Sequence, residues 1–507
     1  MQEKEHNKWY VLGVFVFALL VYLRFGPHEQ PVGGDLSMWD YMAQSIARGS
    51  VPYRDVVNIK TPLGAYIGAA AIWLLRPLDV RDLFAIRYAF LLQAALVVAL
   101  TYLLFEVYWQ RRLLGVLAAS IMLSYDSFGI WNASGAQVKT TALLFGLLSI
   151  YLLAKQKYFW AGFVGSLSFW AWQPGLLFAG VAGLCSLNSL KRGFVRVILG
   201  TALGVLLGVG YFFFVGAARA FYDWCFSFNI SANTSVAAAS GWARLATVID
   251  KAYPDEWLFW WMFPVGFLVH LVDVVVKLRN KEADIKLLAP TLAFVVYGLF
   301  TYFNLQSGPD AIFFLPFIAL YCAYLAMRLG SCIERFKLPA VSIYLNCVLV
   351  LGVVTFFVLD AFGYNPAFTL DEQQQDYSLV FDEISPMDKV YAHGSLDLLV
   401  LGGLVNASKY IYFDRGKDVY AAKLEGGFDK IIGQLEAARP RFVALSKLER
   451  VQHKDQLLAW LKSHYDPYVL VRSTNSGVRA SVYTYEVYVR RGMNLRNQGE
   501  NSDRDSR

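Results

Sequence analysis

The sequence predicts a polytopic α-helical membrane protein with about eleven transmembrane helices, followed by a small α/β domain. The chain has 507 residues, of which 57% are hydrophobic and only 17% are charged, whereas a soluble domain has about 25% charged residues. The apolar residues gather in long uncharged runs, such as residues 197–218, instead of alternating with polar ones. After Asp360 the composition changes to a soluble type, which predicts the second domain.

Each long apolar run predicts one helix across the membrane. A hydrocarbon core of about 30 Å needs roughly 20 helical residues, and a helix satisfies its backbone groups internally. We predict spans near residues 8–25, 86–109, 113–126, 139–154, 158–172, 174–189, 196–217, 257–276, 287–304, 310–327 and 339–360. The first run lacks a small-residue cleavage site, so we expect a retained helix and no signal peptide.

The basic clusters predict the orientation of the chain. Lysine and arginine gather near residues 111–112, 155–157, 191–192, 277–286 and 328–337. If these clusters are cytoplasmic, the N-terminus is cytoplasmic too. We therefore expect a protein of the plasma (inner) membrane whose extracytoplasmic segments are residues 26–85, 127–138, 218–256 and everything after 360.

One short apolar stretch, Pro62 to Leu75, decides the helix count. Its length of about 14 residues suits an interfacial helix better than a span. A span here would also move Arg111 and Arg112 to the other side of the membrane. We therefore expect residues 26–85 to form a first outer loop that contains interfacial helices.

Three segments follow from these patterns: a transmembrane module (1–360), a soluble extracytoplasmic α/β domain (361–490) and a disordered polar tail (491–507). Within the second segment, strands and amphipathic helices alternate, which is typical of an α/β domain. Strands are expected at residues 389–393, 410–413, 441–445 and 481–489, and helices at 427–438 and 454–464.

Several kinds of chemistry are not indicated. The five cysteines lie mainly in apolar runs and the six histidines have no metal-ligand spacing, so we expect no zinc site built by the protein. A divalent cation shared with a lipid phosphate stays open through Asp35 or Asp40. The net charge of +7 reports membrane topology and predicts no nucleic-acid partner.

The first outer loop brings acidic and basic residues together. Gly33 and Gly34 free the backbone just before Asp35, a carboxylate that can act as general base on an acceptor hydroxyl or amine. Arg54 and Lys60 can hold a phosphate. The alternative is that this loop is a solvated connector without chemistry.

The loop resembles the first outer loop of the glycosyltransferase C (GT-C) superfamily, in particular bacterial relatives of the protein O-mannosyltransferases and the lipid A aminoarabinose transferases. Arg87, before the second span, also matches a habitual position of these enzymes. The resemblance covers about residues 8–330. The matching residues are Asp35, Asp40, Tyr41, Gln44, Gly49, Pro52 and Tyr53, then Lys60, Thr61, Pro62, Leu63, Gly64 and Tyr66.

This resemblance implies a reaction. A sugar is transferred, with inversion, from a polyprenyl-phosphate carrier to a lipid, glycan or protein acceptor on the extracytoplasmic face, and no nucleotide is needed. Asp35 matches the catalytic base. Lys60, with Arg54 and Arg87, is expected to bind the lipid phosphate or donor, and Tyr53 to line the substrate cavity.

Some positions depart from the family pattern. Gln137 lies near the place where relatives have an acid at the start of the fourth span, and Gln173 replaces a lysine; both are expected to line the cavity. Asp126 is a candidate second acid, as is Asp40, although a plain helix-end carboxylate is the alternative for Asp126. Lys139 either snorkels to the interface or binds the lipid phosphate.

We therefore predict a GT-C-like integral-membrane glycosyltransferase. A transporter or lipid-carrier flippase is the main alternative, although such proteins usually contain internal repeats, and none is visible in this sequence. A non-catalytic envelope scaffold is the third candidate. An enzyme would lose its function in an Asp35→Asn variant, whereas a scaffold would not.

Overall fold

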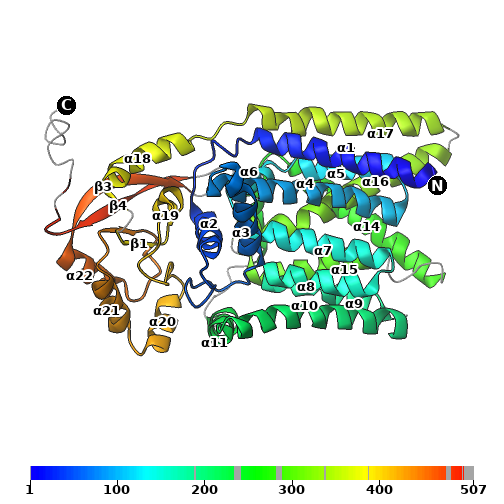
Figure 1. Ribbon diagram of the computed structural model, residues 1–507. Coiled ribbons are helices and arrows are strands. Elements are labelled where there is room, and N and C mark those ends of the chain that lie inside the picture. Colours follow the sequence, from blue (N-terminus) through cyan, green and yellow to red (C-terminus); the bar gives the residue numbers. More distant parts are fainter. Residues whose placement is uncertain are drawn as a thin grey trace.

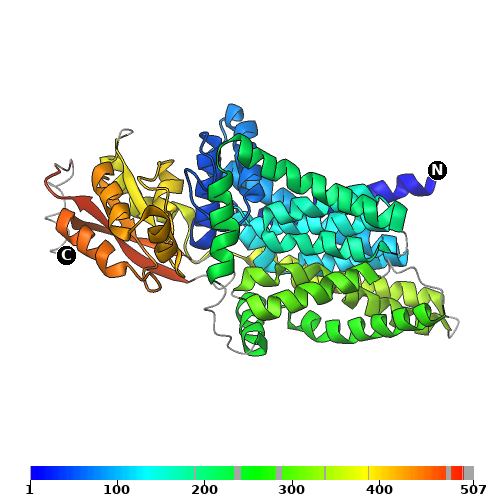
Figure 2. The same ribbon diagram turned by 90° about the horizontal axis from the view of Figure 1, so that it is seen from below.

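The computed structural model describes residues 2–187, 190–232, 241–280, 288–305, 307–335, 338–385, 388–474, 481–493 and 495. It has two parts, a bundle of long helices and a smaller C-terminal domain at one end of that bundle (Figure 1). We call that end of the bundle its domain-facing end. Figure 2 shows the same two parts from below. The predicted disordered tail lies outside the described residues from position 496 onward.

Every predicted span overlaps a helix of the bundle. Five of the helices are long and apolar enough to cross a membrane, or up to six if α5 and the helix after it form one bent span. The number of eleven spans therefore stays a prediction. The helices are α1 (Gln2–Arg24), α4 (Asp82–Trp109), α5 (Arg112–Leu123), α7 (Val138–Ala154), α8 (Tyr158–Ala171), α9 (Leu176–Leu184), α10 (Val195–Phe214), α14 (Trp257–Arg279), α15 (Ala289–Asn304), α16 (Leu315–Arg335) and α17 (Pro339–Val353).

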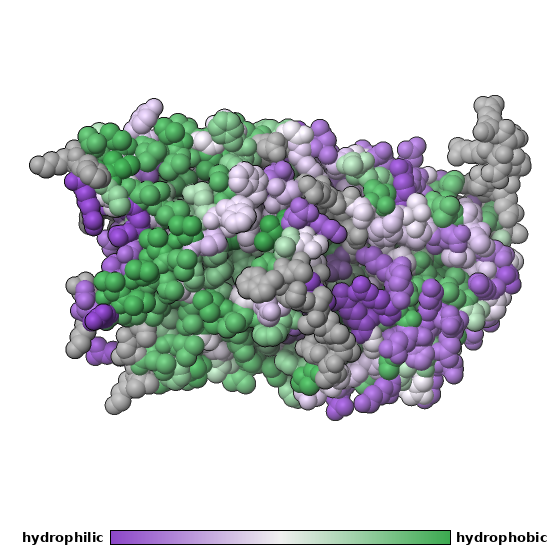
Figure 3. Space-filling model, turned by 180° about the vertical axis from the view of Figure 1, so that it is seen from behind, coloured by the Kyte–Doolittle hydropathy of each residue, from purple (hydrophilic) through white to green (hydrophobic). Residues whose placement is uncertain are grey.

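The bundle has a buried centre and an apolar surface. Most of α4 and α16 is buried, whereas most of α10, α14 and α17 is exposed although these helices are equally apolar. Figure 3 shows the result: hydrophobic residues cover the bundle, and hydrophilic residues gather on the C-terminal domain. An exposed apolar belt around a helical bundle is what a lipid-facing surface requires.

Three helices lie at the domain-facing end of the bundle: α2 (Gly34–Ala47), α3 (Leu63–Leu75) and α6 (Asp126–Ser134). Helix α3 stands where the interfacial helix is expected. A Cβ atom on its Gly68 would lie 2.8 Å from the Cβ of Ala43, so only glycine lets α2 and α3 approach this closely. Helix α6 is bent by 61° from α5, which places Asp126 at the bend.

Shorter elements connect these helices. They are η1 (Arg76–Leu78), η2 (Gln173–Gly175), η4 (Leu190–Phe194), α11 (Ala218–Tyr222), η5 (Asp223–Ser227), α12 (Phe228–Ala232), α13 (Gly241–Ala252), η7 (Gly308–Phe314), η8 (Val354–Val358) and η9 (Leu359–Gly363).

The C-terminal domain is a four-stranded sheet with flanking helices. The strand order is β1-β2-β4-β3; β1 and β2 are parallel, and β4 is antiparallel to both of its neighbours. The strands are β1 (Val390–His393), β2 (Phe442–Leu445), β3 (Tyr465–Thr474) and β4 (Val482–Arg490), and the helices are α18 (Leu370–Glu383), α19 (Asp397–Gly402), α20 (Lys417–Glu425), α21 (Phe428–Ala438) and α22 (Lys454–His464).

One expected strand is wrong and one strand is unexpected. Residues 410–413 are irregular, because the amide of Phe413 donates to His393 Nε2 at 2.8 Å instead of joining a strand ladder. Strand β3 begins at Tyr465 and continues with Asp466 and Pro467, a pair typical of turns. The structure accommodates this proline beside a bulge, where no regular ladder bond is lost.

The C-terminal domain contacts the first loop of the chain through specific hydrogen bonds. Gln373 makes two of them with the backbone of Val32, at 2.8 and 2.7 Å, and Gly33 forms a β-bridge with Thr474. The loop that holds Asp35 is therefore part of the boundary between the two domains. Further bonds join Leu396 N to Ser37 Oγ (3.2 Å), Asn406 N to Tyr41 Oη (2.9 Å) and Gln44 Nε2 to Val400 O (3.1 Å).

Candidate functional site

Asp35 lies in the first turn of α2, on a backbone that two glycines make possible. Gly34 has a left-handed φ of 58°, a conformation that glycine adopts without strain. A Cβ on Gly33 would lie 2.1 Å from the carbonyl oxygen of Thr474. Gly34 thus supplies the backbone freedom expected before Asp35, whose side chain keeps access to solvent although the surrounding protein partly desolvates its carboxyl group.

Four lysines surround this carboxylate. Lys60 and Lys139 belong to the bundle, and Lys417 and Lys447 belong to the C-terminal domain. Burial raises the pKa of Asp35, but the four positive charges lower it by more, so the net pKa is below its usual value. Asp35 is therefore ionised at neutral pH, as a general base must be.

The loop that carries Lys60 is held in place from both sides. Asn58 Oδ1 accepts the amides of Ile59 and Lys60 at 2.7 and 3.1 Å, a local turn typical of asparagine. Tyr53 donates its hydroxyl to the Lys60 carbonyl at 2.8 Å, and Gln173 donates to the Ile59 carbonyl at 2.7 Å. Tyr53 and Gln173, which we expect to line the cavity, thus fix the backbone of the Lys60 loop.

The Lys60 ammonium is influenced by both cations and carboxylates. Burial, and secondarily the charge of Lys139, lower the pKa of Lys60 to about 8, against the raising effects of Asp35 and Asp310. Within the described part of the chain no carboxylate forms an ion pair with Lys60. A half-buried cation without a counter-ion favours binding of an anion.

Lys139, in contrast, has a partner. Its ammonium lies 2.5 Å from Asp310 Oδ1 and 5.4 Å from the centre of the Trp172 ring. Asp310 also accepts the amide of Ser307 through Oδ2 and so caps η7. Asp310 was not among the predicted site residues, although one sequence signal was present: Lys139 and Asp310 both lie where an apolar run begins.

Asp40 and Arg87 are buried away from the four lysines. Asp40 Oδ1 accepts the amide of Ala136 at 2.8 Å, and burial raises the pKa of Asp40 to about 7. Arg87 is completely buried and donates to the carbonyls of Ser134, Pro27 and Pro31. Its guanidinium therefore ties two loops together in this structure.

Arg54 and Gln137, two other predicted site residues, make contacts mainly with their own surroundings. Arg54 is exposed, pairs with Asp55 at 2.9 Å and donates to the carbonyl of Val215 at 3.2 Å. Gln137 is buried and directly precedes α7, where its amide donates to the Gly135 carbonyl. Arg54 is therefore not among the cations that act on the Asp35 carboxylate.

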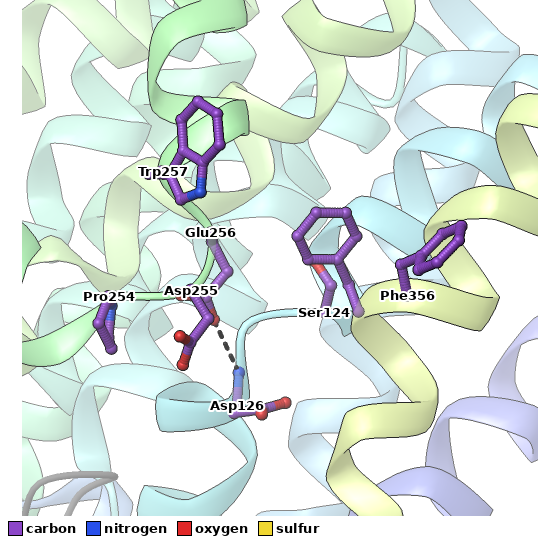
Figure 4. Close-up of a pocket in the computed structure, with 8 residues that line it drawn as sticks. Ser124, Asp126, Pro254, Asp255, Glu256, Trp257 and Phe356 are labelled. Atoms are coloured by element: carbon purple, nitrogen blue, oxygen red, sulfur yellow. Dashed lines mark hydrogen bonds between the residues drawn. The ribbon is translucent and has the colours of Figure 1, made fainter.

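Asp126 lines a different cavity, of about 340 Å³, at the domain-facing end of the bundle (Figure 4). Its amide donates to Glu256 Oε1 at 3.2 Å. Burial, together with the charge of Asp126, raises the pKa of Glu256 to about 8. The residues around the cavity are Ser124, Asp126, Pro254, Asp255, Glu256, Trp257, Phe356 and Phe357.

A metal site built by the protein alone is not visible in the described ranges. No group of three or more His, Cys, Asp or Glu side chains there has the geometry to hold a metal ion. A cation held jointly with a substrate phosphate needs fewer protein ligands, so the divalent cation that the sequence leaves open stays untested.

Solved structures resemble this fold over most of the chain. ArnT from Cupriavidus metallidurans bound to undecaprenyl phosphate is 14% identical, with 94% of this chain and 98% of that one covered and a TM-score of 0.61. Its apo state gives a TM-score of 0.59 at 13% identity. The Archaeoglobus fulgidus oligosaccharyltransferase in the apo form is 10% identical, with 92% and 74% covered and a TM-score of 0.52. No protein-family model and no curated protein matches the sequence.

These likenesses show the architecture. The chain shares the helical-bundle fold of these structures, with a small sheet-containing domain, as expected from its apolar runs and from its resemblance to the GT-C superfamily. The identities are low, so the chemistry of this chain has to be argued from its own residues.

Proposed function

We propose that the protein is an integral-membrane glycosyltransferase that moves a sugar from a polyprenyl-phosphate carrier to an acceptor. One observation carries this proposal: the ionised carboxylate of Asp35 and the ammonium of Lys60 interact electrostatically at the domain-facing end of the bundle. They do so in a fold shared with ArnT, which was crystallised with undecaprenyl phosphate. A base beside a phosphate-binding cation is what this transfer needs.

The two residues act on opposite partners in the reaction. Asp35 takes the proton from the acceptor hydroxyl or amine as that group attacks the anomeric carbon of the sugar. The bond between this carbon and the phosphate oxygen breaks, and the polyprenyl phosphate leaves with the bonding electrons. Lys60 stabilises the negative charge that develops on the phosphate. A single displacement of this kind inverts the anomeric configuration.

The remaining candidate residues either hold the loops around Asp35 and Lys60 or lie outside the proposed reaction site. Tyr53 and Gln173 hold the Lys60 loop, and Arg87 holds the loops around α2. Lys139 is neutralised by Asp310, which leaves Lys60 as the bundle's anion-binding cation. Asp40 and Asp126 lie in other surroundings and do not serve as the base. Arg54 and Gln137 lie at the rim of the reaction site.

We propose the membrane arrangement that the basic clusters predict. The N-terminus is cytoplasmic, the protein lies in the inner membrane, and the C-terminal domain is extracytoplasmic. The acceptor is a lipid, glycan or protein that reaches the domain boundary from that side. The helices with exposed apolar surfaces support this placement in a bilayer.

Sugar transfer by the purified protein tests this proposal. The protein is reconstituted in lipid and supplied with a panel of radiolabelled polyprenyl-phosphate sugars and a membrane extract as acceptor source. We expect transfer from at least one donor by the wild type and none above background by a folded Asp35→Asn variant. Vectorial flux of a lipid-linked sugar without any transfer would instead support the flippase alternative.

A further inference from the structure

The sheet of the C-terminal domain ends at the boundary that holds Asp35. Strand β4 is antiparallel to both β2 and β3, and β1 is parallel to β2, so β1, β2 and β3 all end at the same edge. We call this edge, residues 393–395, 446–447, 473–474 and 482–483, the carboxyl edge. In open α/β sheets ligands bind beside such edges.

This carboxyl edge contacts α2 on both sides of Asp35. Thr474, the last residue of β3, forms the β-bridge with Gly33. The amide of Leu396, just after β1, donates to Ser37 Oγ at 3.2 Å. Asp35 lies between these two contacts in the sequence, so its carboxylate stands at the junction of the two domains.

Lys447 is the cation that the edge itself contributes. It lies two residues after the end of β2, with a left-handed φ of 57°, and its ammonium lies 5.7 Å from the centre of the Tyr483 ring. The Tyr483 hydroxyl bonds in turn to Ser395 and Ser473, both at 3.2 Å. Lys417, the other cation of this domain near Asp35, is already paired with Asp414 at 2.5 Å.

We infer that the C-terminal domain forms one wall of the reaction site, and that Lys447 is a positioning residue that stabilises the Asp35 carboxylate from across the domain boundary. This inference rests on the proposed function, since it assigns Lys447 a role through Asp35. It makes the C-terminal domain a part of the catalytic unit, in addition to any role in selecting the acceptor.

The charge balance around Asp35 supports this role. The groups that act on it are Lys60 and Lys139 from the bundle and Lys447, Lys417 and Tyr412 from the C-terminal domain. Of these four lysines, Lys139 and Lys417 form ion pairs with other carboxylates, whereas Lys60 and Lys447 form none within the residues that the structure describes. If Lys60 binds the leaving phosphate, Lys447 remains to act on Asp35.

The test compares Lys447→Met and Lys447→Arg with the matched control Lys462→Met, an exposed lysine on α22 of the same domain. The readout is the pH dependence of kcat/KM in the transfer assay. We expect Lys447→Met to move the acidic limb to higher pH, so that its loss of activity is larger at pH 5 than at pH 8. Lys447→Arg and Lys462→Met should keep the acidic limb of the wild-type pH profile. If Lys447→Met also keeps that limb unchanged, the inference is wrong.

A second measurement does not depend on activity. The variant with Asp35→Cys and Lys447→Cys is treated in membranes with a short bifunctional thiol reagent, and the linked peptides are identified by mass spectrometry. We expect a cross-link between positions 35 and 447 that the variants with only one of the two substitutions lack. Its absence in folded protein would show that the two positions do not lie close together. An Asp35→Asn variant that stays active would instead reject the proposed base, which separates that failure from a failure of Lys447.

Discussion

Two acidic regions lie at the domain-facing end of the bundle, and the charged groups around them have opposite signs. Around Asp35 four lysines gather, and they lower the pKa of its carboxyl group. In the cavity of Asp126 the neighbours are Asp255 and Glu256, and the pKa of Glu256 is raised to about 8. The same kind of side chain is therefore an anion in one region and a neutral acid in the other.

This difference shows where a phosphate-linked donor can react. A polyprenyl phosphate carries negative charge, which the lysines at Asp35 attract and the carboxyl groups at Asp126 repel. The acid alone does not define the site; the cations brought to it by two domains do. Changes near Asp35 should therefore reduce transfer strongly, whereas changes near Asp126 should not.

Replacing Asp35 by asparagine should have the largest effect on activity. The variant keeps the shape of the side chain but cannot accept a proton, so we expect kcat to fall by roughly 10²- to 10⁴-fold, the usual contribution of a general base. The measurement is sugar transfer at saturating donor by protein whose thermal unfolding is unchanged. Activity within a few-fold of the wild type would remove Asp35 as the base.

Replacing Lys60 by methionine should have the next largest effect. We expect kcat/KM to fall by roughly 10²-fold, because one cation that stabilises the leaving phosphate is lost. In the wild type kcat/KM should also decline above pH 8, since the pKa of Lys60 is about 8 and the neutral amine no longer attracts the donor. Arg54→Met, which removes an exposed cation of the same loop, is the matched control and should change kcat/KM by less than about threefold.

Replacing Lys139 by methionine should act on stability. The change removes one partner of a buried ion pair, which typically costs about 3–5 kcal/mol of unfolding free energy. Asp310→Asn in the same chain should recover much of this loss, because the charge that paired with Lys139 is gone and asparagine can still accept the Ser307 amide. Thermal unfolding of the two single variants and the double variant measures this coupling, and simple additivity would contradict it.

Replacing Asp40 by asparagine should be nearly silent in activity. The pKa of Asp40 is raised to about 7, so wild-type stability is highest when this acid is protonated and declines as the pH rises from about 4 to 7. The asparagine variant lacks this decline and should unfold at a higher temperature than the wild type at pH 8. A large loss of transfer would contradict the separation of Asp40 from the reaction site.

Replacing Glu256 by glutamine should have the smallest effect on transfer. Glutamine resembles the protonated acid, which the raised pKa favours, so the variant should match the wild type near pH 5 and be more stable at pH 9. Transfer should stay within about threefold, as for other changes outside a reaction site. A strong loss of transfer would show that the cavity of Asp126 takes part in the reaction.

Much of the helical fold could be predicted from the sequence, and so could part of the proposed site. Each long uncharged run overlaps a helix of the bundle, because only a helix satisfies the backbone in lipid. Asp35 and Lys60 are found in the first loop because both lie in one short stretch. Lys417 and Lys447 are more than 350 residues away from Asp35 in the chain, and no local pattern links them to it.

Other features have local causes that only the folded chain shows. Arg87 matches a family position, and its guanidinium donates to three backbone carbonyls. Residues 410–413 alternate like a strand, but the ring of His393 takes one of their amides. Strand β3 was missed because Asp466 and Pro467 look like a turn.

The central claim is that the phosphate of the donor binds at Lys60, beside the Asp35 base. The most direct test is cross-linking with a photoreactive polyprenyl-phosphate probe in lipid, followed by mass spectrometry of the labelled peptides. The account predicts labels in the peptides around residues 33–61, and less labelling in Lys60→Met than in Arg54→Met. Labels concentrated in the peptides around residues 124–126 and 254–257 would contradict it.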